Sequence, residues 1–157
     1  MMICFCRVTA TDIDNCDILD LIQRNCDLNH ELVKTEVIVQ SLDFSDPVDQ
    51  SDFLADVDII IAGDIIYDND VTEKFVQFLS HLNNKFDNSF TVIVALEKRY
   101  VFTIADLDTV APAFNFFTQT LQDARALSYE FLEIDFPQYF CYERGTDMIL
   151  MQIKFKQ

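Results

Sequence analysis

Apolar positions along the chain fall into two patterns, short continuous runs and longer stretches with helical spacing. Apolar runs occupy residues 4–11, 36–44, 57–63 and 90–97. Short apolar runs between polar turns are typical of strands, and runs without alternation are typical of strands buried on both faces of a parallel sheet. We therefore expect strands at all four positions, with both faces buried at "VDIIIAG" (57–63) and "FTVIVALE" (90–97).

Three stretches with helical spacing separate or follow these runs. The first extends from a cap at Asp14 to about Leu28, and the second follows Asp70 and Glu73, which have the spacing of a capping box. The third covers 107–121, where Pro112 either begins the regular helix or kinks a longer one. The apolar stripes are formed by Ile18, Leu21, Ile22 and Cys26, by Val71, Phe75, Phe78, Leu79 and Leu82, and by Leu107, Val110, Ala111, Phe114, Phe117 and Leu121.

Two further strands are predicted at the end of the chain, "YEFLEIDF" (129–136) and "DMILMQIKF" (147–155). Their connection is short enough for antiparallel neighbours. Strands and helices otherwise alternate, which predicts an α/β fold with parallel strands joined by right-handed crossovers. The polar stretch 45–56 is expected to be a loop. At 157 residues, we expect residues 1–157 to form a single domain.

The charge and the apolar runs narrow the classes of partner. The formal net charge is -16, from 27 acidic and 11 basic residues. This balance disfavours nucleic acid, since phosphate binding depends on Lys and Arg, and it favours a basic protein or a cationic ligand. No apolar run reaches the roughly 18 residues that a membrane span needs, and "MMICFC" lacks the basic region of a signal peptide. We expect no membrane partner and an intracellular location, nucleus or cytoplasm.

The five cysteines are odd in number and contain no Cys-x-x-Cys pair. We interpret them as reduced, packed thiols of an intracellular protein. A zinc site formed with His30 is the alternative, but its spacing matches no known ligand framework. The five cysteines are Cys4, Cys6, Cys16, Cys26 and Cys141. The zinc alternative uses the first four, and no metal is expected.

Candidate site residues stand where the apolar runs end, because ligands of open α/β sheets bind beyond the carboxyl ends of the strands. A carboxylate such as Asp12 accepts hydrogen bonds from two vicinal ribose hydroxyls, although it can equally cap a helix. Phe44 can flank an adenine ring or shield the end of the sheet. The candidates are Asp12, Asp43, Phe44, Gly63, Asp64, Tyr67, Glu97 and Arg99.

The segment "IIIAGDIIYDND" (59–70) carries the most specific pattern. Gly63 permits close approach of a ligand to the backbone where the buried strand leaves the sheet. Asp64 and Tyr67 follow at once. A solvated acidic loop is the alternative, and helix capping accounts only for Asp68 and Asp70.

Together with "VTATDID", "QRNCDLN", "LDF", "ALEKRYVFT", the "FPQ" of "DFPQ" and "YER", this segment resembles the seven-strand S-adenosylmethionine-dependent methyltransferases. Within them, it resembles the protein-lysine methyltransferases with an Asp-x-x-Tyr motif, methyltransferase family 16. The resemblance runs across essentially the whole chain and implies a Rossmann-like sheet, S-adenosylmethionine as cofactor and a lysine-bearing protein as substrate.

The resemblance also assigns roles to the candidate residues. Asp12 would hold the ribose of the cofactor, Phe44 would lie near the adenine where the family commonly has Trp, and Gly63 would offer backbone beside the cofactor. Asp43 is placed on the cofactor side as well. Asp64 and Tyr67 would line the lysine channel as catalytic residues, with Glu97 and Arg99 on the substrate side.

One departure from the family pattern concerns the start of the chain. The family's first strand and its glycine-rich loop should precede "VTATD", where this chain has seven residues. We therefore expect a sheet without its first strand, from an incomplete sequence, a degenerate protein or a chain completed by another polypeptide. Two alternatives to a protein-lysine methyltransferase follow: a noncatalytic acidic interaction module, and a methyltransferase acting on a small amine.

Overall fold

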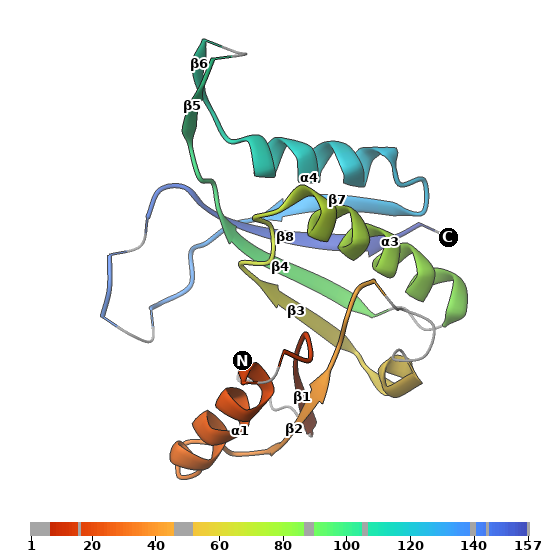
Figure 1. Cartoon of the computed structure of the whole chain (residues 1–157), viewed down its shortest axis with the longest axis vertical. Coiled ribbons are helices and arrows are strands. Elements are labelled where there is room, and N and C mark those ends of the chain that lie inside the picture. Colours follow the sequence, from red (N-terminus) through yellow and green to blue (C-terminus); the bar gives the residue numbers. More distant parts are fainter. Residues whose placement is uncertain are drawn as a thin grey trace. The chain divides into compact units, whose positions relative to one another are not determined.

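The structure is a computed structural model that describes residues 7–15, 17–45, 52–86, 90–104, 107–138, 141–143 and 145–156. The chain divides into two compact units, residues 1–50 and 51–157. Each unit contains a parallel pair of strands and at least one helix (Figure 1). The predicted α/β class is therefore confirmed, while the single-domain arrangement stays a prediction.

The first unit contains β1 (Arg7–Asp12), α1 (Ile18–Leu28) and β2 (Glu36–Ser41). The two strands are parallel and in register over their full length, so that both end at the same edge. Asp14 was predicted to cap the helix, but the cap residue is Asp17, whose side chain makes no capping hydrogen bond. Backbone hydrogen bonds from Asn15 and Ile18 close the turn instead.

The second unit contains a four-stranded sheet in the order β3-β4-β8-β7. β4 is parallel to β3 and antiparallel to β8, which is antiparallel to β7. The predicted antiparallel pair at the end of the chain is thus confirmed. The elements are the short 3-10 helix η1 (Asp52–Asp56), β3 (Ile59–Gly63), α3 (Asn69–Lys85), β4 (Thr91–Glu97), β5 (Val101–Thr103), β6 (Asp108–Val110), α4 (Pro112–Asp123), β7 (Leu127–Leu132) and β8 (Met148–Phe155).

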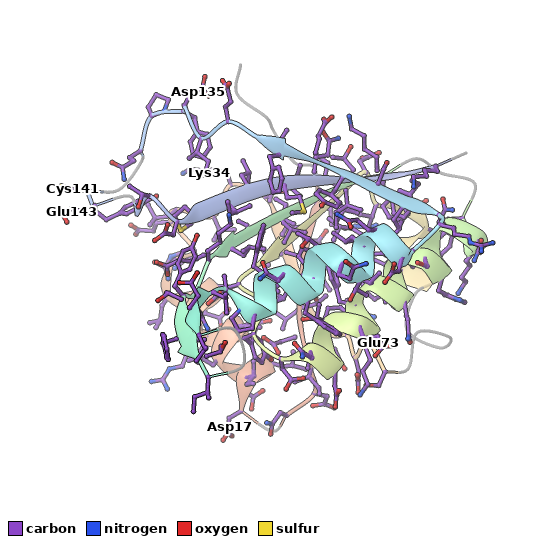
Figure 2. All side chains as sticks on the ribbon, turned by 90° about the horizontal axis from the view of Figure 1, so that it is seen from above. Asp17, Lys34, Glu73, Asp135, Cys141 and Glu143 are labelled. Carbon is purple, nitrogen blue, oxygen red and sulfur yellow. The ribbon has the colours of Figure 1, made fainter. Side chains whose placement is uncertain are left out.

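The core of the second unit lies between this sheet and the two helices α3 and α4, which cover the same face (Figures 1 and 2). Alternate residues of the central strands point into it, because side chains of a strand alternate between faces. The phenylalanine rings of the two helices meet there, with 6.4 Å between the centroids of Phe75 and Phe117. Fully buried members include Phe78, Leu79, Leu82, Val92, Val94, Leu121, Met151 and Ile153.

The other face of this sheet departs from the prediction. Both strands of the β3/β4 pair were expected to be buried on both faces, but in β4 only alternate residues are buried, and Ile61 of β3 is exposed. Two described helices of this unit pack on one face, and no described element of the unit covers the opposite one, so half of each apolar run stays partly accessible. A continuous apolar run therefore identified the strands correctly but overestimated their burial.

The start of one helix differs from the sequence analysis, and the start of another agrees with it. α3 is capped by Asp68, whose Oδ1 accepts a hydrogen bond from the amide of Val71 at 3.0 Å. The predicted capping box is wrong, since Glu73 accepts from Gln77 Nε2 instead and lies on the outer side of α3 (Figure 2). α4 begins at Pro112, as one of the two alternatives proposed. Residues 108–110, predicted as helical, form β6 of a hairpin with β5 that the sequence analysis missed.

Candidate functional site

The first unit brings its candidate residues to one edge. Asp12 is the last residue of β1, and its carbonyl accepts a hydrogen bond from the amide of Leu42, immediately before Asp43 and Phe44. The two parallel strands thus deliver all three candidates to their carboxyl ends, as predicted. Phe44 is half-buried, whereas Asp12 is exposed.

Both carboxylates of this edge have one oxygen fixed by the adjacent backbone. Asp12 Oδ1 accepts from the amide of Ile13 at 2.8 Å, and Asp43 Oδ1 accepts from the amide of Ser45 at 2.7 Å. Asp12 therefore does not cap α1, which begins at Ile18. An exposed carboxylate with one oxygen oriented by backbone can still accept from a ligand hydroxyl.

The second unit places Gly63 and Asp64 at the carboxyl end of β3, beside the parallel strand β4. The amide of Asp64 donates to the carbonyl of Ala95 at 2.8 Å, so the pairing of the strands continues one residue past Gly63. A Cβ added to Gly63 would meet no atom of the chain within 4 Å. The backbone at this position therefore faces open space.

Asp64 leaves the sheet in a left-handed conformation, with φ 52°. Asp is one of the few residues besides Gly that adopt this region readily, because its short side chain can bond locally. The next turn is anchored by Ile66, which is buried. Tyr67, one residue further, is 62% exposed. Asp64 and Tyr67 are thus exposed on either side of the buried Ile66.

Arg99 connects this loop to the end of β4. Its Nη2 donates to Asp64 Oδ2 at 2.6 Å, in an ion pair whose side chains are 53% and 60% exposed, respectively. The sequence analysis listed both residues but did not pair them, since they are 35 positions apart. The paired carboxylate keeps Oδ1 as an acceptor, while the guanidinium offsets its charge.

Glu97, the other substrate-side candidate, is the last residue of β4 and is exposed. β8 begins opposite it, and the amide of Lys98 donates to the carbonyl of Asp147 at 2.9 Å. A shallow cavity of about 390 Å³ lies at the same edge of the sheet, between the end of β7 and the start of β8. It is lined by Phe131, Leu132, Ile134, Gly145, Thr146, Met148, Ile149 and Leu150.

The sequence analysis did not single out this cavity, because its residues come from both ends of the long β7–β8 connection. Asp135, Cys141 and Glu143 of that connection lie away from the sheet (Figure 2).

Cys141 and Cys26 are free thiols. Cys4, Cys6 and Cys16, three of the four cysteines of the zinc alternative, lie outside the described residues. In the described ranges, no three His, Cys, Asp or Glu side chains gather as metal ligands do.

None of the helices that the structure describes is long and apolar enough to cross a membrane.

Comparison with solved structures supports the fold. The chain matches the crystal structure of the CurJ carbon methyltransferase with a TM-score of 0.52 and 14% identity, over 94% of this chain and 40% of that one. At this identity, the likeness concerns the fold alone, and it agrees with the predicted Rossmann-like methyltransferase sheet.

Comparison with known sequences identifies the family. The chain is 31% identical to methyltransferase-like protein 22 of Homo sapiens over 93% of its own length and 42% of the human protein. It is 30% identical to the Mus musculus protein of the same name, again over 93% of its length and 43% of that protein. The chain thus spans less than half the length of these relatives. The sequence model of the family described as lysine methyltransferase matches residues 2–120, and the chain therefore belongs to that family.

Proposed function

We propose that this chain carries the cofactor and substrate residues of an S-adenosylmethionine-dependent protein-lysine N-methyltransferase. The observation that carries the proposal is the outward placement of Asp64 and Tyr67 at the carboxyl edge of β3, with Asp64 held by Arg99 of the neighbouring strand end. Membership of the lysine methyltransferase family supports the same reaction.

Residues at the carboxyl ends of β1 and β2 would bind the adenosine part of the cofactor. Asp12 would accept hydrogen bonds from the ribose hydroxyls through the carboxylate that the Ile13 amide already orients. Phe44 would pack against the adenine, with Asp43 beside it. In the second unit, the open backbone at Gly63 would allow a ligand to approach closely. When bound, S-adenosylmethionine supplies an electrophilic methyl group on a sulfonium sulfur.

The substrate lysine must reach that methyl group as a neutral amine with its lone pair aligned. Asp64 Oδ1 would accept a hydrogen bond from the amine and Tyr67 would orient it, without a covalent intermediate on the protein. Because Arg99 offsets the charge of Asp64, the pair attracts a polar amine without favouring the ammonium form as strongly as a lone carboxylate would. After methyl transfer, the amine nitrogen would carry one surplus proton, which would leave to solvent.

A lysine-bearing protein is the partner that membership of the lysine methyltransferase family favours. The net charge of -16 attracts basic segments and disfavours nucleic acid. Glu97, exposed at the end of β4, would contact the cationic surroundings of the target lysine together with the Asp64–Arg99 pair.

The experiment that tests this function compares Asp64→Ala and Tyr67→Ala with Tyr142→Ala, a tyrosine that is also exposed but lies on the β7–β8 connection. Methyl transfer to a library of lysine-containing proteins is measured with a labelled cofactor, and cofactor affinity is measured separately by calorimetry. We expect the first two variants to lose at least about 100-fold in rate, within the range for a positioned polar group, with little change in cofactor affinity. The control should retain both.

A loss of affinity that matches the loss of rate would place Asp64 and Tyr67 in the cofactor site instead. Absence of any transfer by the native chain would favour the noncatalytic acidic module. One observation favours that alternative. In the part of the chain that the structure describes, β1 pairs only with β2, and β3 pairs only with β4, so no described strand joins the two sheets.

A further inference from the structure

The hairpin β5–β6 extends away from the four-stranded sheet and from α4 (Figure 1). Its strands pair Val101 with Val110 and Thr103 with Asp108. Apolar side chains along it are nevertheless open to solvent: Phe102 is 66% exposed, Ile104 is 85% exposed and Leu107 is 76% exposed. We call residues 100–104 and 107–110 the apolar arm.

Such exposure is unusual for a two-stranded element. An isolated hairpin is marginally stable in water and gains stability by packing an apolar face on something else. In the apolar arm, Val101 and Phe102, on opposite faces of β5, are both exposed. Leu107 also adopts a left-handed conformation, with φ 52°, which is disfavoured for Leu. Clustered apolar side chains on a projecting element are typical of a contact surface.

The base of the apolar arm is fixed to the rest of the unit. Lys98, three residues before β5, places its Nζ 4.4 Å from the ring centroid of Phe114 in the first turn of α4. The Phe114 ring in turn lies near Phe131 of β7, at 6.4 Å between centroids. The segment that leads into the arm is therefore in contact with α4.

The apolar arm is also continuous with the candidate substrate site. Tyr100, its first residue, directly follows Arg99, which binds Asp64. A segment bound along the arm would thus run from the acidic edge of the sheet onto an apolar surface. At the edge itself, Asp64, Asp68 and Glu97 are exposed, and Arg99 offsets the charge of Asp64 alone. This combination matches a peptide that has a cationic residue at one position and apolar residues a short distance away.

We propose that the apolar arm binds the segment of the substrate protein that carries the target lysine, by contacting apolar residues beside that lysine. The inference rests on the proposed function, and it adds the sequence preference of the substrate. From Arg99, an extended chain reaches Phe102 in about 10 Å and Ile104 in about 17 Å, at roughly 3.3 Å per residue. The preferred apolar residues therefore lie about three to five positions from the lysine.

The test uses a positional-scanning library of peptides with one central lysine. Methylation by the native chain is compared with that by the double variant Phe102→Ser with Ile104→Ser. A matched control carries Leu28→Ser with Leu32→Ser, two leucines that are as exposed but lie in the first unit. A third variant, Phe102→Leu with Ile104→Val, keeps the arm apolar. Circular dichroism checks that all four proteins fold alike.

We expect the native chain to prefer apolar residues three to five positions from the lysine. The serine variant should lose this preference, with kcat/KM for the preferred peptides reduced about tenfold or more, while peptides without apolar residues are methylated as before. The apolar variant should restore the preference, and the control should keep it. Methylation without such a preference, or a preference that survives in the serine variant, would overturn the proposal.

Binding of the same peptides, followed by fluorescence anisotropy without cofactor, separates this inference from the proposed function. Binding that depends on the apolar arm without any methylation would leave the arm as a peptide site and remove the enzymatic function. Absence of arm-dependent binding would overturn the arm even if methylation occurs. Analytical sedimentation of the native chain and the serine variant measures the oligomeric state. A native dimer that is lost in the serine variant would overturn the proposal and assign the arm to contacts between two copies of the chain.

Discussion

The two units of the chain contain equally regular strands and helices but differ in burial. In residues 7–15 and 17–45, no described residue is fully buried, and apolar side chains such as Leu21 and Leu28 of α1 are exposed. In the second unit, α3 and α4 enclose a core of phenylalanine and aliphatic side chains against the sheet. The comparison shows that an apolar pattern determines which elements form, whereas burial requires a second layer to pack against them.

The difference has a direct energetic meaning. Burial of apolar surface is the main favourable term in folding, worth about 25 cal/mol per Å². The stability of the second unit should therefore come from its core. The first unit relies on its parallel strand pair and on one helix whose apolar stripe is largely accessible.

The largest predicted effect concerns matched helix substitutions in the two units. Phe117→Ala in α4 removes a fully buried ring that contacts Phe75, and should lower the free energy of unfolding by about 3–5 kcal/mol. Leu21→Ala in α1 removes a half-exposed side chain and should lower it by less than about 1 kcal/mol. Urea unfolding followed by far- and near-ultraviolet circular dichroism measures both.

Hydrogen exchange provides a second view of the same prediction. Amides of β1 and α1 should exchange through local opening, well before those of β4 and β8, since their contacts bury less surface. Equal destabilisation by the two substitutions, or equal protection of β1 and β4, would contradict the difference in burial. It would show that the first unit gains a second layer in solution.

The elements themselves were largely predictable from the sequence. The strand around "VDIIIAG" and the helix after it follow from local patterns, since strand and helix periods are visible within a few residues. The parallel direction of β1 and β2 and of β3 and β4, and the antiparallel end, followed from the order of elements, whereas which parallel strands are neighbours was not predicted. Those inferences needed no knowledge of side-chain contacts.

What escaped prediction depends on tertiary contacts or on competing local signals. The ion pair between Asp64 and Arg99 joins positions far apart in sequence, so no local pattern reveals it. Residues 107–110 were assigned to a helix because Leu107 and Val110 extend the stripe of α4. The β-branched residues at 101, 103, 109 and 110 were the signal for the hairpin. Roles of the site residues remain predictions.

The second prediction separates the cofactor residues of the first unit from the substrate residues of the second. Asp12→Ala should weaken S-adenosylmethionine binding by about 1.5–3 kcal/mol, the usual value for hydrogen bonds to a charged group. Asp14→Ala, another exposed acid two residues further on, is the control and should have no effect. Calorimetry measures both. Unchanged affinity in Asp12→Ala would remove this residue from the cofactor site.

The smallest effect concerns the ion pair that joins the two strand ends of the second unit. A double-mutant cycle on Asp64→Ala and Arg99→Ala should give a coupling energy of about 0.2–1 kcal/mol in the free energy of unfolding, because both side chains are more than half exposed. The pair Glu130–Lys154, with the same 2.6 Å separation and about half-exposed side chains, is a matched control on β7 and β8. Its coupling should be similar.

The two pairs should differ in function rather than in stability. If Arg99 orients Asp64 for the lysine amine, Arg99→Ala should reduce methyl transfer, while Lys154→Ala should leave it unchanged at equal stability. Raising the ionic strength to about 1 M shortens the screening length to about 3 Å and should weaken both couplings alike. A coupling of the Asp64–Arg99 pair above about 2 kcal/mol would indicate that this edge is shielded from solvent. Loss of methyl transfer in both variants would mean that transfer depends on the positive charge of this unit in general. Arg99 would then have no specific role beside Asp64.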